Sequence, residues 1–219
     1  MTSLSHPPVP VPYIARVHRL LQDGQRKLLG LVGPPGAGKS TLATALQQTF
    51  MEVSRVVPMD GFHLANAELR RLGRTDRKGA PDTFDSAGYV ALLHRLRRQR
   101  PDETIYVPEF RREIEEPIAG AIAVLPDMPL VITEGNYLLL EDSHWVDVAP
   151  MLDEVWYVDL DRALRMERLA RRHEAYGRSP QEAIDWTANT DEPNAWLIEQ
   201  TKARATLVFQ WEGEAAPLY

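Results

Sequence analysis

The sequence lacks several features that would point to particular classes of protein. It contains no cysteine, which excludes disulfide bonds and catalysis by a thiolate. The uncharged run at residues 117–126 covers about half a membrane span, and residues 1–12 have neither the basic start nor the apolar stretch of a secretory signal. Positive charge is not in excess, because the formal net charge is −6, which argues against binding to nucleic acid or to a membrane surface. These absences predict a cytoplasmic protein whose partners are small molecules.

Length and periodicity predict one α/β domain spanning residues 1–219. With 219 residues, 44% of them hydrophobic, the chain can bury one core with a small lid. Apolar runs predict strands at residues 28–32, 55–59, 104–107, 130–133, 154–160 and 206–211. After an extended segment at residues 1–12, helices are expected at residues 13–21, 40–50, 86–99, 162–176, 179–187 and 194–205. This alternation is typical of a doubly wound, mostly parallel sheet with helices on both faces and ligands at the carboxyl ends of the strands.

The most specific motif runs from Gly33 to Thr41 and matches the phosphate-binding pattern G-x-x-x-x-G-K-[ST] directly after a predicted strand. Glycines in this turn let successive backbone N–H groups and the N-terminus of the next helix surround a phosphate. Lys39 is predicted to neutralise the β- and γ-phosphates, and Ser40 to hold Mg²⁺ through its hydroxyl. The predicted nucleotide-binding residues of the motif are Gly33, Pro34, Pro35, Gly36, Ala37, Gly38, Lys39, Ser40 and Thr41.

Two carboxylates follow buried strands and are expected at the same edge of the sheet. Asp60 comes after residues 55–59 and is predicted to orient an acceptor hydroxyl for attack on the γ-phosphate, with a share in holding Mg²⁺. An aspartate of ordinary pKa is a weak base, so positioning is expected to matter more than early proton removal. Glu134 ends the strand at residues 130–133 and is the second predicted Mg²⁺ ligand. The alternative for each carboxylate is a strand-ending turn without catalytic function.

A basic helix is expected to act as a lid, which we define as residues 162–178. Arg165, Arg168 and Arg172 follow i, i+3, i+7 spacing and therefore share one face. Arg168, Arg171 and Arg172 are the predicted catalytic arginines, because guanidinium groups stabilise negative charge on a transferring phosphoryl group. A basic face that is merely solvated is the alternative. Residues 179–182, with the sequence Ser-Pro-Gln-Glu, predict a capped helix start and therefore a hinge beside the lid.

The acceptor is expected to contact loops near the same sheet edge. Residues 61–85, which we call the acceptor loop, interrupt the strand and helix alternation with charged and glycine residues. A solvated loop, with its aromatic residues serving only in packing, is the alternative. The predicted substrate-binding residues are His63, Lys78, Asp82, Phe84, Tyr106, Phe110, Arg111 and Asn136. Asn194, in the stretch 191–194, is the predicted residue on the side of the nucleotide base.

Taken together, residues 33–41, 59–63, 79–85, 107–110, 133–136 and 168–173 resemble the motifs of the phosphoribulokinase, uridine kinase and bacterial pantothenate kinase superfamily. The likeness covers about residues 13–211 and is greatest toward a bacterial group of fructokinase-like proteins named after fructose transport. The resemblance implies a P-loop fold, ATP as donor, Asp60 orienting the acceptor, Glu134 near Mg²⁺ and the helix with Arg168 and Arg172 as the lid. Uridine kinases carry an aspartate after the aromatic residue of their Pro-x-Tyr-Asp segment, whereas Arg111 stands here and disfavours a nucleoside.

The leading hypothesis is therefore a kinase that phosphorylates a small-molecule hydroxyl, with a sugar first and pantothenate or a uridine-type nucleoside as alternatives. An alternative of another class is a P-loop regulatory protein that binds nucleotide without an acceptor. A guanine switch would need an Asn-Lys-x-Asp base reader, which is absent, and a motor or transport ATPase would usually have an Asp-Glu pair where this chain has Thr133 and Glu134. The oligomeric state stays open, with a homodimer as one option.

Overall fold

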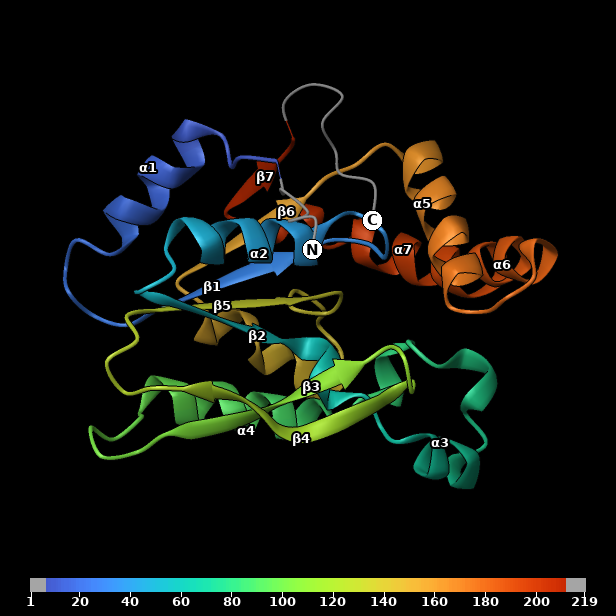
Figure 1. Ribbon diagram of the computed structural model, residues 1–219, viewed down its shortest axis with the longest axis horizontal. Coiled ribbons are helices and arrows are strands. Elements are labelled where there is room, and N and C mark those ends of the chain that lie inside the picture. Colours follow the sequence, from blue (N-terminus) through green and yellow to red (C-terminus); the bar gives the residue numbers. More distant parts are fainter. Residues whose placement is uncertain (1–6, 212–219) are drawn as a thin grey trace, which may run out of the picture.

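The computed structural model describes residues 7–211 and is built around a five-stranded parallel sheet (Figure 1). In spatial order the strands are β2 (Ser54–Pro58), β5 (Leu130–Gly135), β1 (Lys27–Val32), β6 (Glu154–Val158) and β7 (Leu207–Phe209). Every neighbouring pair is parallel. The predicted fold class, a mostly parallel doubly wound sheet, is confirmed.

Helices cover both faces of this sheet because its strands are apolar on both sides. Along β1, Leu29 and Leu31 pack with α1 (Val11–Leu20) and α2 (Lys39–Thr49), while Leu28 and Val32 belong to a second cluster with α4 (Ser86–Arg97). Side chains that alternate along a strand point to opposite faces, so a continuous apolar run indicates burial on both. Figure 1 shows α1 and α2 on one side of the sheet and α4 on the other.

A β-hairpin below the sheet corrects one expectation. Residues 104–107 were expected to add a strand to the main sheet, but β3 (Ile105–Arg111) pairs antiparallel with β4 (Glu116–Val124), and the two form a separate sheet. The sequence analysis did not predict β4. Pro117 and Gly120 weaken the strand pattern, and both are tolerated because β4 is half solvent-exposed.

The acceptor loop is more regular than expected. It contains α3 (Asn66–Leu72) and short 3-10 turns at Thr75–Arg77 and Pro81–Thr83. A Cβ atom at Gly61 would lie 2.3 Å from the carbonyl oxygen of Pro108, so the start of the loop packs closely against the hairpin. The acceptor loop is therefore held in place by the hairpin as well as by its own turns.

Three helices form the lid side of the molecule. They are α5 (Arg162–Ala175), α6 (Pro180–Trp186) and α7 (Glu192–Glu199), with a π-helical segment at Thr187–Asp191 before α7. The predicted capping box between Ser179 and Glu182 is confirmed, whereas the helix expected at 194–205 starts earlier and ends earlier as α7. In Figure 1, α5, α6 and α3 all lie at the end of the molecule toward which β1 and β2 point.

The N-terminal expectation also needs adjustment. Residues 1–6 of the predicted extended segment lie outside the described residues, and α1 starts at Val11, inside that segment. Pro12 does not prevent this start, because proline lacks only an N–H group that the first helical turn leaves unpaired anyway. Within residues 7–211, no helix is both long enough and apolar enough to cross a membrane.

Candidate active site

The phosphate-binding motif forms a tight loop between β1 and α2. Gly36 and Gly38 adopt left-handed φ angles of 79° and 91°, which favour glycine, and Gly38 is the N-cap of α2. A Cβ atom at Gly36 would lie 2.8 Å from Leu169 Cγ of α5, so the loop also packs directly against the lid helix. The helix N-terminus and the loop backbone therefore face the same space as the lid, as anion binding requires.

Lys39 is held by backbone and side-chain oxygens within this loop. Its Nζ donates to the carbonyl oxygens of Gly33 at 2.9 Å and Pro34 at 3.1 Å, and to Oδ1 of Asn136 at 2.7 Å. Only 8% of Lys39 is exposed, and this burial lowers its pKa from 10.5 to about 8. A phosphate beside Nζ would supply the full negative charge that these neutral oxygens do not.

Ser40 and Glu134 meet beside Lys39. The Ser40 hydroxyl donates to Glu134 Oε1 at 3.0 Å, and Glu134 is at the end of β5, level with Pro58 of β2. Burial and the nearby Asp60 carboxylate raise the pKa of Glu134. A hydroxyl and a carboxylate fit Mg²⁺, which prefers oxygen and is usually held by one or two carboxylates together with substrate phosphates. Within residues 7–211 no cluster of three or more His, Cys, Asp or Glu could hold a metal without such phosphates.

Asp60 lies on the neighbouring strand end and forms an ion pair that the sequence analysis missed. It follows β2 in a 3-10 turn at Met59–Phe62, and its Oδ2 accepts a hydrogen bond from Arg112 at 3.2 Å. Burial opposes ionisation of this carboxyl, but the electrostatic interactions with His63 and with the cations Arg112, Lys39 and Arg172 outweigh it and lower the Asp60 pKa. Asp60 is thus a carboxylate that stays ionised and is oriented by Arg112.

Aromatic rings form the wall next to Asp60. His63 lies between Phe84 and Phe110, with ring centroids 4.0 Å and 4.5 Å away. Lys78 lies over Phe110 at 5.0 Å and donates to Asn66 Oδ1 at 2.8 Å. The acceptor loop and the hairpin therefore meet in a cluster that is apolar at its centre and polar at its rim.

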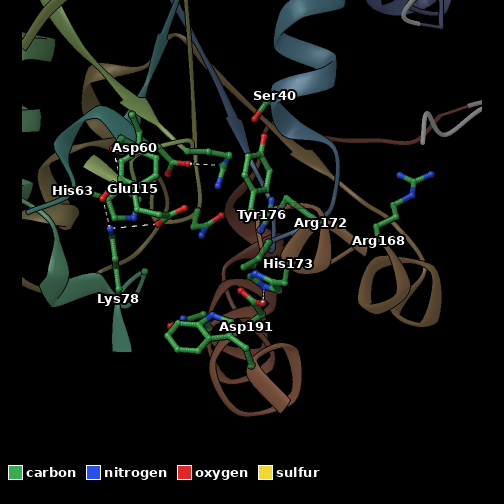
Figure 2. Close-up of a pocket in the computed structure, with 18 of the residues that line it drawn as sticks. Ser40, Asp60, His63, Lys78, Glu115, Arg168, Arg172, His173, Tyr176 and Asp191 are labelled. Atoms are coloured by element: carbon green, nitrogen blue, oxygen red, sulfur yellow. Dashed lines mark hydrogen bonds and ion pairs between the residues drawn. The ribbon is translucent and has the colours of Figure 1, made fainter. Parts of the chain in front are cut away.

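These groups line one cavity of about 1320 Å³. In Figure 2, Ser40 of the phosphate-binding loop lies at one side, Asp60, His63, Lys78 and Glu115 lie at a second, and Arg168, Arg172 and His173 of the lid lie at a third. Tyr176 projects between the three groups. The predicted site residues that line the cavity are Pro35, Gly36, Gly38, Lys39, Ser40, Thr41, Asp60, His63, Lys78, Phe84, Phe110, Glu134, Asn136, Arg168, Arg171, Arg172 and Asn194.

Some predicted site residues lie outside the cavity lining. Asp82 pairs instead with Arg74 and Arg77 on the acceptor loop itself, at 3.4 Å and 2.6 Å. Gly33, Pro34 and Ala37 lie in the phosphate-binding loop but do not reach the lining. Asp82 therefore belongs with the solvated part of the loop.

A bulge in the hairpin explains why Tyr106 and Arg111 point away from the cavity. The β3–β4 register shifts between Val107 and Glu109, so Tyr106 ends up on the outer side, 63% exposed, although it is four residues from Phe110. Arg111 pairs with Glu109 on that outer side, at 2.7 Å. The arginine that lines the cavity is the next residue, Arg112, which strand alternation from Phe110 would have indicated.

The lid arginines are divided between the cavity and the protein interior. Arg165 is 1% exposed and joins α5 to the phosphate-binding loop and to α7, since it donates to the Pro35 carbonyl oxygen at 3.4 Å and pairs with Glu192 of α7. Arg165, which the spacing places on one helix face with Arg168 and Arg172, does not line the cavity, because its guanidinium is satisfied inside the fold.

Arg171 lines the cavity but also pairs with Glu167, one helical turn away, at 2.5 Å. Arg172 lies close enough to Asp60 and Lys39 for its charge to lower the pKa of both. Arg172 is therefore the lid arginine whose charge acts on both Asp60 and Lys39.

Further residues line the cavity that were not among the predicted site residues. His173 and Asp191 form a hydrogen-bonded pair, Nε2 to Oδ2, at 2.7 Å. This pair joins α5 to the π-helical segment, so it stabilises the lid side of the cavity. The other residues that line the cavity, were not predicted and carry large polar, charged or aromatic side chains are Asn66, Asp76, Arg112, Glu115, Tyr176, Arg178 and Trp186.

Many known proteins resemble this chain, although no family model matches it. A protein of Schizosaccharomyces pombe that is provisionally named a uridine kinase is 34% identical over 206 residues, which are 89% of this chain and 87% of the relative. A solved structure from Silicibacter sp. TM1040, provisionally described as a fructose transport system kinase, is 36% identical, covers 90% of this chain and 96% of its own, and has a TM-score of 0.81. YFH7 from Saccharomyces cerevisiae has a TM-score of 0.79 at 19% identity, with 94% and 100% of the two chains covered, which shows a shared fold.

Proposed function

The chain belongs to the P-loop kinases of the uridine kinase, pantothenate kinase and phosphoribulokinase group, and we propose that this ATP-dependent small-molecule kinase phosphorylates a hydroxyl of a sugar, with Mg²⁺ bound beside Ser40 and Glu134. The observation that carries the proposal is the joint lining of one cavity by the phosphate-binding loop, Asp60 and the aromatic cluster of the acceptor loop. A protein that only bound nucleotide would need no such second half.

The acceptor half has the composition that sugar binding uses. Phe110 and Phe84 offer ring faces and edges to the C–H groups of a sugar, and Asn66 and Asn136 place amide groups at the rim of the same cavity. The name of the Silicibacter structure agrees with a sugar. Uridine is the second candidate, because the Schizosaccharomyces pombe relative carries the name of a uridine kinase.

The proposed reaction gives each side chain a step. Lys39 exchanges its carbonyl partners for the β- and γ-phosphates, and Arg172 with Arg168 stabilises negative charge on the transferring group from the lid side. Asp60 accepts a hydrogen bond from the acceptor hydroxyl and aims its oxygen at the γ-phosphorus. The oxygen–phosphorus bond forms as the bond to the ADP oxygen breaks, and the hydroxyl proton passes to Asp60 late. Mg²⁺ bound at Ser40 and Glu134 would neutralise phosphate charge.

The lowered pKa of Asp60 supports this order of events. A carboxylate whose pKa lies below its ordinary value is a weak base, so it contributes mainly by holding the hydroxyl in line. Arg112, which donates to Oδ2, leaves Oδ1 of the same carboxylate for the hydroxyl. Arg112 is thus proposed as the residue that orients Asp60.

A coupled assay of ADP release from ATP and Mg²⁺ tests the proposal. Fructose and other sugars, uridine, pantothenate and glycerate are compared with a blank that lacks acceptor. We expect ADP release that depends on a sugar and is lost in Asp60→Asn, with Arg111→Gln as a matched control on the outer side of the hairpin. ADP release in the blank that lacks acceptor would contradict a kinase of this kind, and so would the absence of ADP release with every acceptor. ADP release with uridine alone would favour uridine, the second candidate, over a sugar.

A further inference from the structure

The orientation of His63 defines which of its ring nitrogens can face a ligand. Nδ1 lies 2.8 Å from the backbone carbonyl oxygen of Asp60. A carbonyl oxygen only accepts hydrogen bonds, so Nδ1 carries the hydrogen, and in the neutral ring Nε2 is then an acceptor.

Nε2 of His63 has no hydrogen-bond partner among the described residues. His63 itself lines the cavity. The flanking rings of Phe84 and Phe110 hold the imidazole plane, so Nε2 has a defined direction. Because Asp60 and His63 are three residues apart on one turn, the carboxylate and Nε2 form two hydrogen-bond acceptors on the same wall.

The cations on this wall are already neutralised by the protein. Arg112 pairs with Asp60 at 3.2 Å, and Lys78 pairs with Glu115 at 3.4 Å while it also donates to Asn66. An acceptor with a carboxylate or phosphate group would have to break one of these pairs to gain a partner. The acceptor side therefore favours a neutral molecule that donates hydrogen bonds.

We propose that the acceptor is an uncharged vicinal diol, in which one hydroxyl binds Asp60 and is phosphorylated and the neighbouring hydroxyl donates to Nε2 of His63. This inference rests on the proposed function and narrows its substrate class. It makes His63 a specificity-determining residue, and it separates neutral sugars from acidic acceptors such as pantothenate and glycerate.

The test uses the sugar with the highest kcat/KM and each of its monodeoxy analogues. In the wild-type protein, the analogue that lacks the hydroxyl next to the phosphorylated one is expected to lose at least about tenfold in kcat/KM, since a site built to accept a hydroxyl hydrogen bond discriminates against its absence. His63→Phe keeps the stacked ring but removes the acceptor, so the parent sugar should fall to about the rate of the analogue. His63→Gln places a carbonyl oxygen near Nε2 and should restore part of the discrimination.

Tyr106→Phe is the matched control, because Tyr106 is an aromatic residue on the outer side of the hairpin. Its ratio of parent to deoxy rates should equal that of the wild type. If the sugar is phosphorylated but every monodeoxy analogue that keeps the phosphorylated hydroxyl reacts as well as the parent sugar, the inference is wrong while the kinase assignment stands. The same holds if pantothenate or glycerate exceeds the sugar in kcat/KM. If no acceptor supports ADP release, the proposed function fails and the inference fails with it. The wild-type comparison decides even if a His63 variant does not fold.

Discussion

Replacing Lys39 by methionine should make the stability of the protein depend on pH in a calculable way. Burial lowers the Lys39 pKa from 10.5 in the unfolded chain to about 8 in the folded protein. Between these two values the unfolded chain holds a proton that folded Lys39 has released, so the free energy of unfolding rises as pH rises. A difference of about 2.5 in pKa, at about 1.4 kcal/mol for each unit, corresponds to about 3 kcal/mol.

Lys39→Met removes this titration, so the difference in unfolding free energy between wild type and variant isolates it. We expect the wild type to gain about 2 to 3 kcal/mol relative to Lys39→Met between pH 7 and pH 10.5, whatever the absolute effect of the lost hydrogen bonds. Urea unfolding without nucleotide, followed by tryptophan fluorescence, measures both proteins at each pH. Lys202→Met is the control, because Lys202 lies outside the phosphate-binding loop and forms a half-exposed ion pair with Asp159 at 2.9 Å. A difference that does not change with pH would show that Lys39 is not held in a desolvated loop, and would refute the description of the phosphate site.

The remaining predictions concern the acceptor side. Asp60→Asn should lower kcat by about 10² to 10⁴ fold, while the Kd for ATP, measured by calorimetry, changes by less than about threefold. An equal loss in kcat and in ATP affinity would show that Asp60 does not act specifically in the transition state. Arg112→Gln should lower the steady-state kcat/KM for the acceptor by at least about tenfold, because Asp60 loses its orienting partner, whereas Arg111→Gln should leave this ratio unchanged. Equal effects of the two substitutions would contradict the positions that the hairpin gives these arginines. Gly61→Ala should cost about 1 to 3 kcal/mol in urea unfolding, because its Cβ atom would lie 2.3 Å from the Pro108 carbonyl oxygen, and a neutral effect would mean that loop and hairpin do not touch.

The parts of the site that sequence analysis located correctly are those whose position follows from local chain direction. Gly36 and Gly38 need left-handed backbone angles that the motif supplies within a few residues. Asp60 and Glu134 each end a buried parallel strand, and parallel strands bring their carboxyl ends to one edge regardless of how the rest of the chain is arranged. The motif and the strand ends therefore predict one edge of the sheet and its phosphate site.

The acceptor side could not be located in the same way, because it depends on pairings between distant segments. Tyr106 and Phe110 would share one face of a regular strand, and the bulge between Val107 and Glu109 that separates them becomes visible only when β3 is paired with β4. Spacing alone likewise does not show that Arg165 is neutralised by Glu192, which lies 27 residues further along the chain. Non-local contacts of this kind are not encoded in any short stretch of sequence.

Phosphorus-31 NMR of the products formed from ATP, Mg²⁺ and a panel of neutral sugars tests the central claim most directly. We expect ADP and a sugar phosphate ester in equal amounts from the wild type, and neither product above background from Asp60→Asn. Inorganic phosphate in place of the ester would identify a hydrolase, and the same ester yield from Asp60→Asn would show that the carboxylate on the cavity wall does not direct the acceptor.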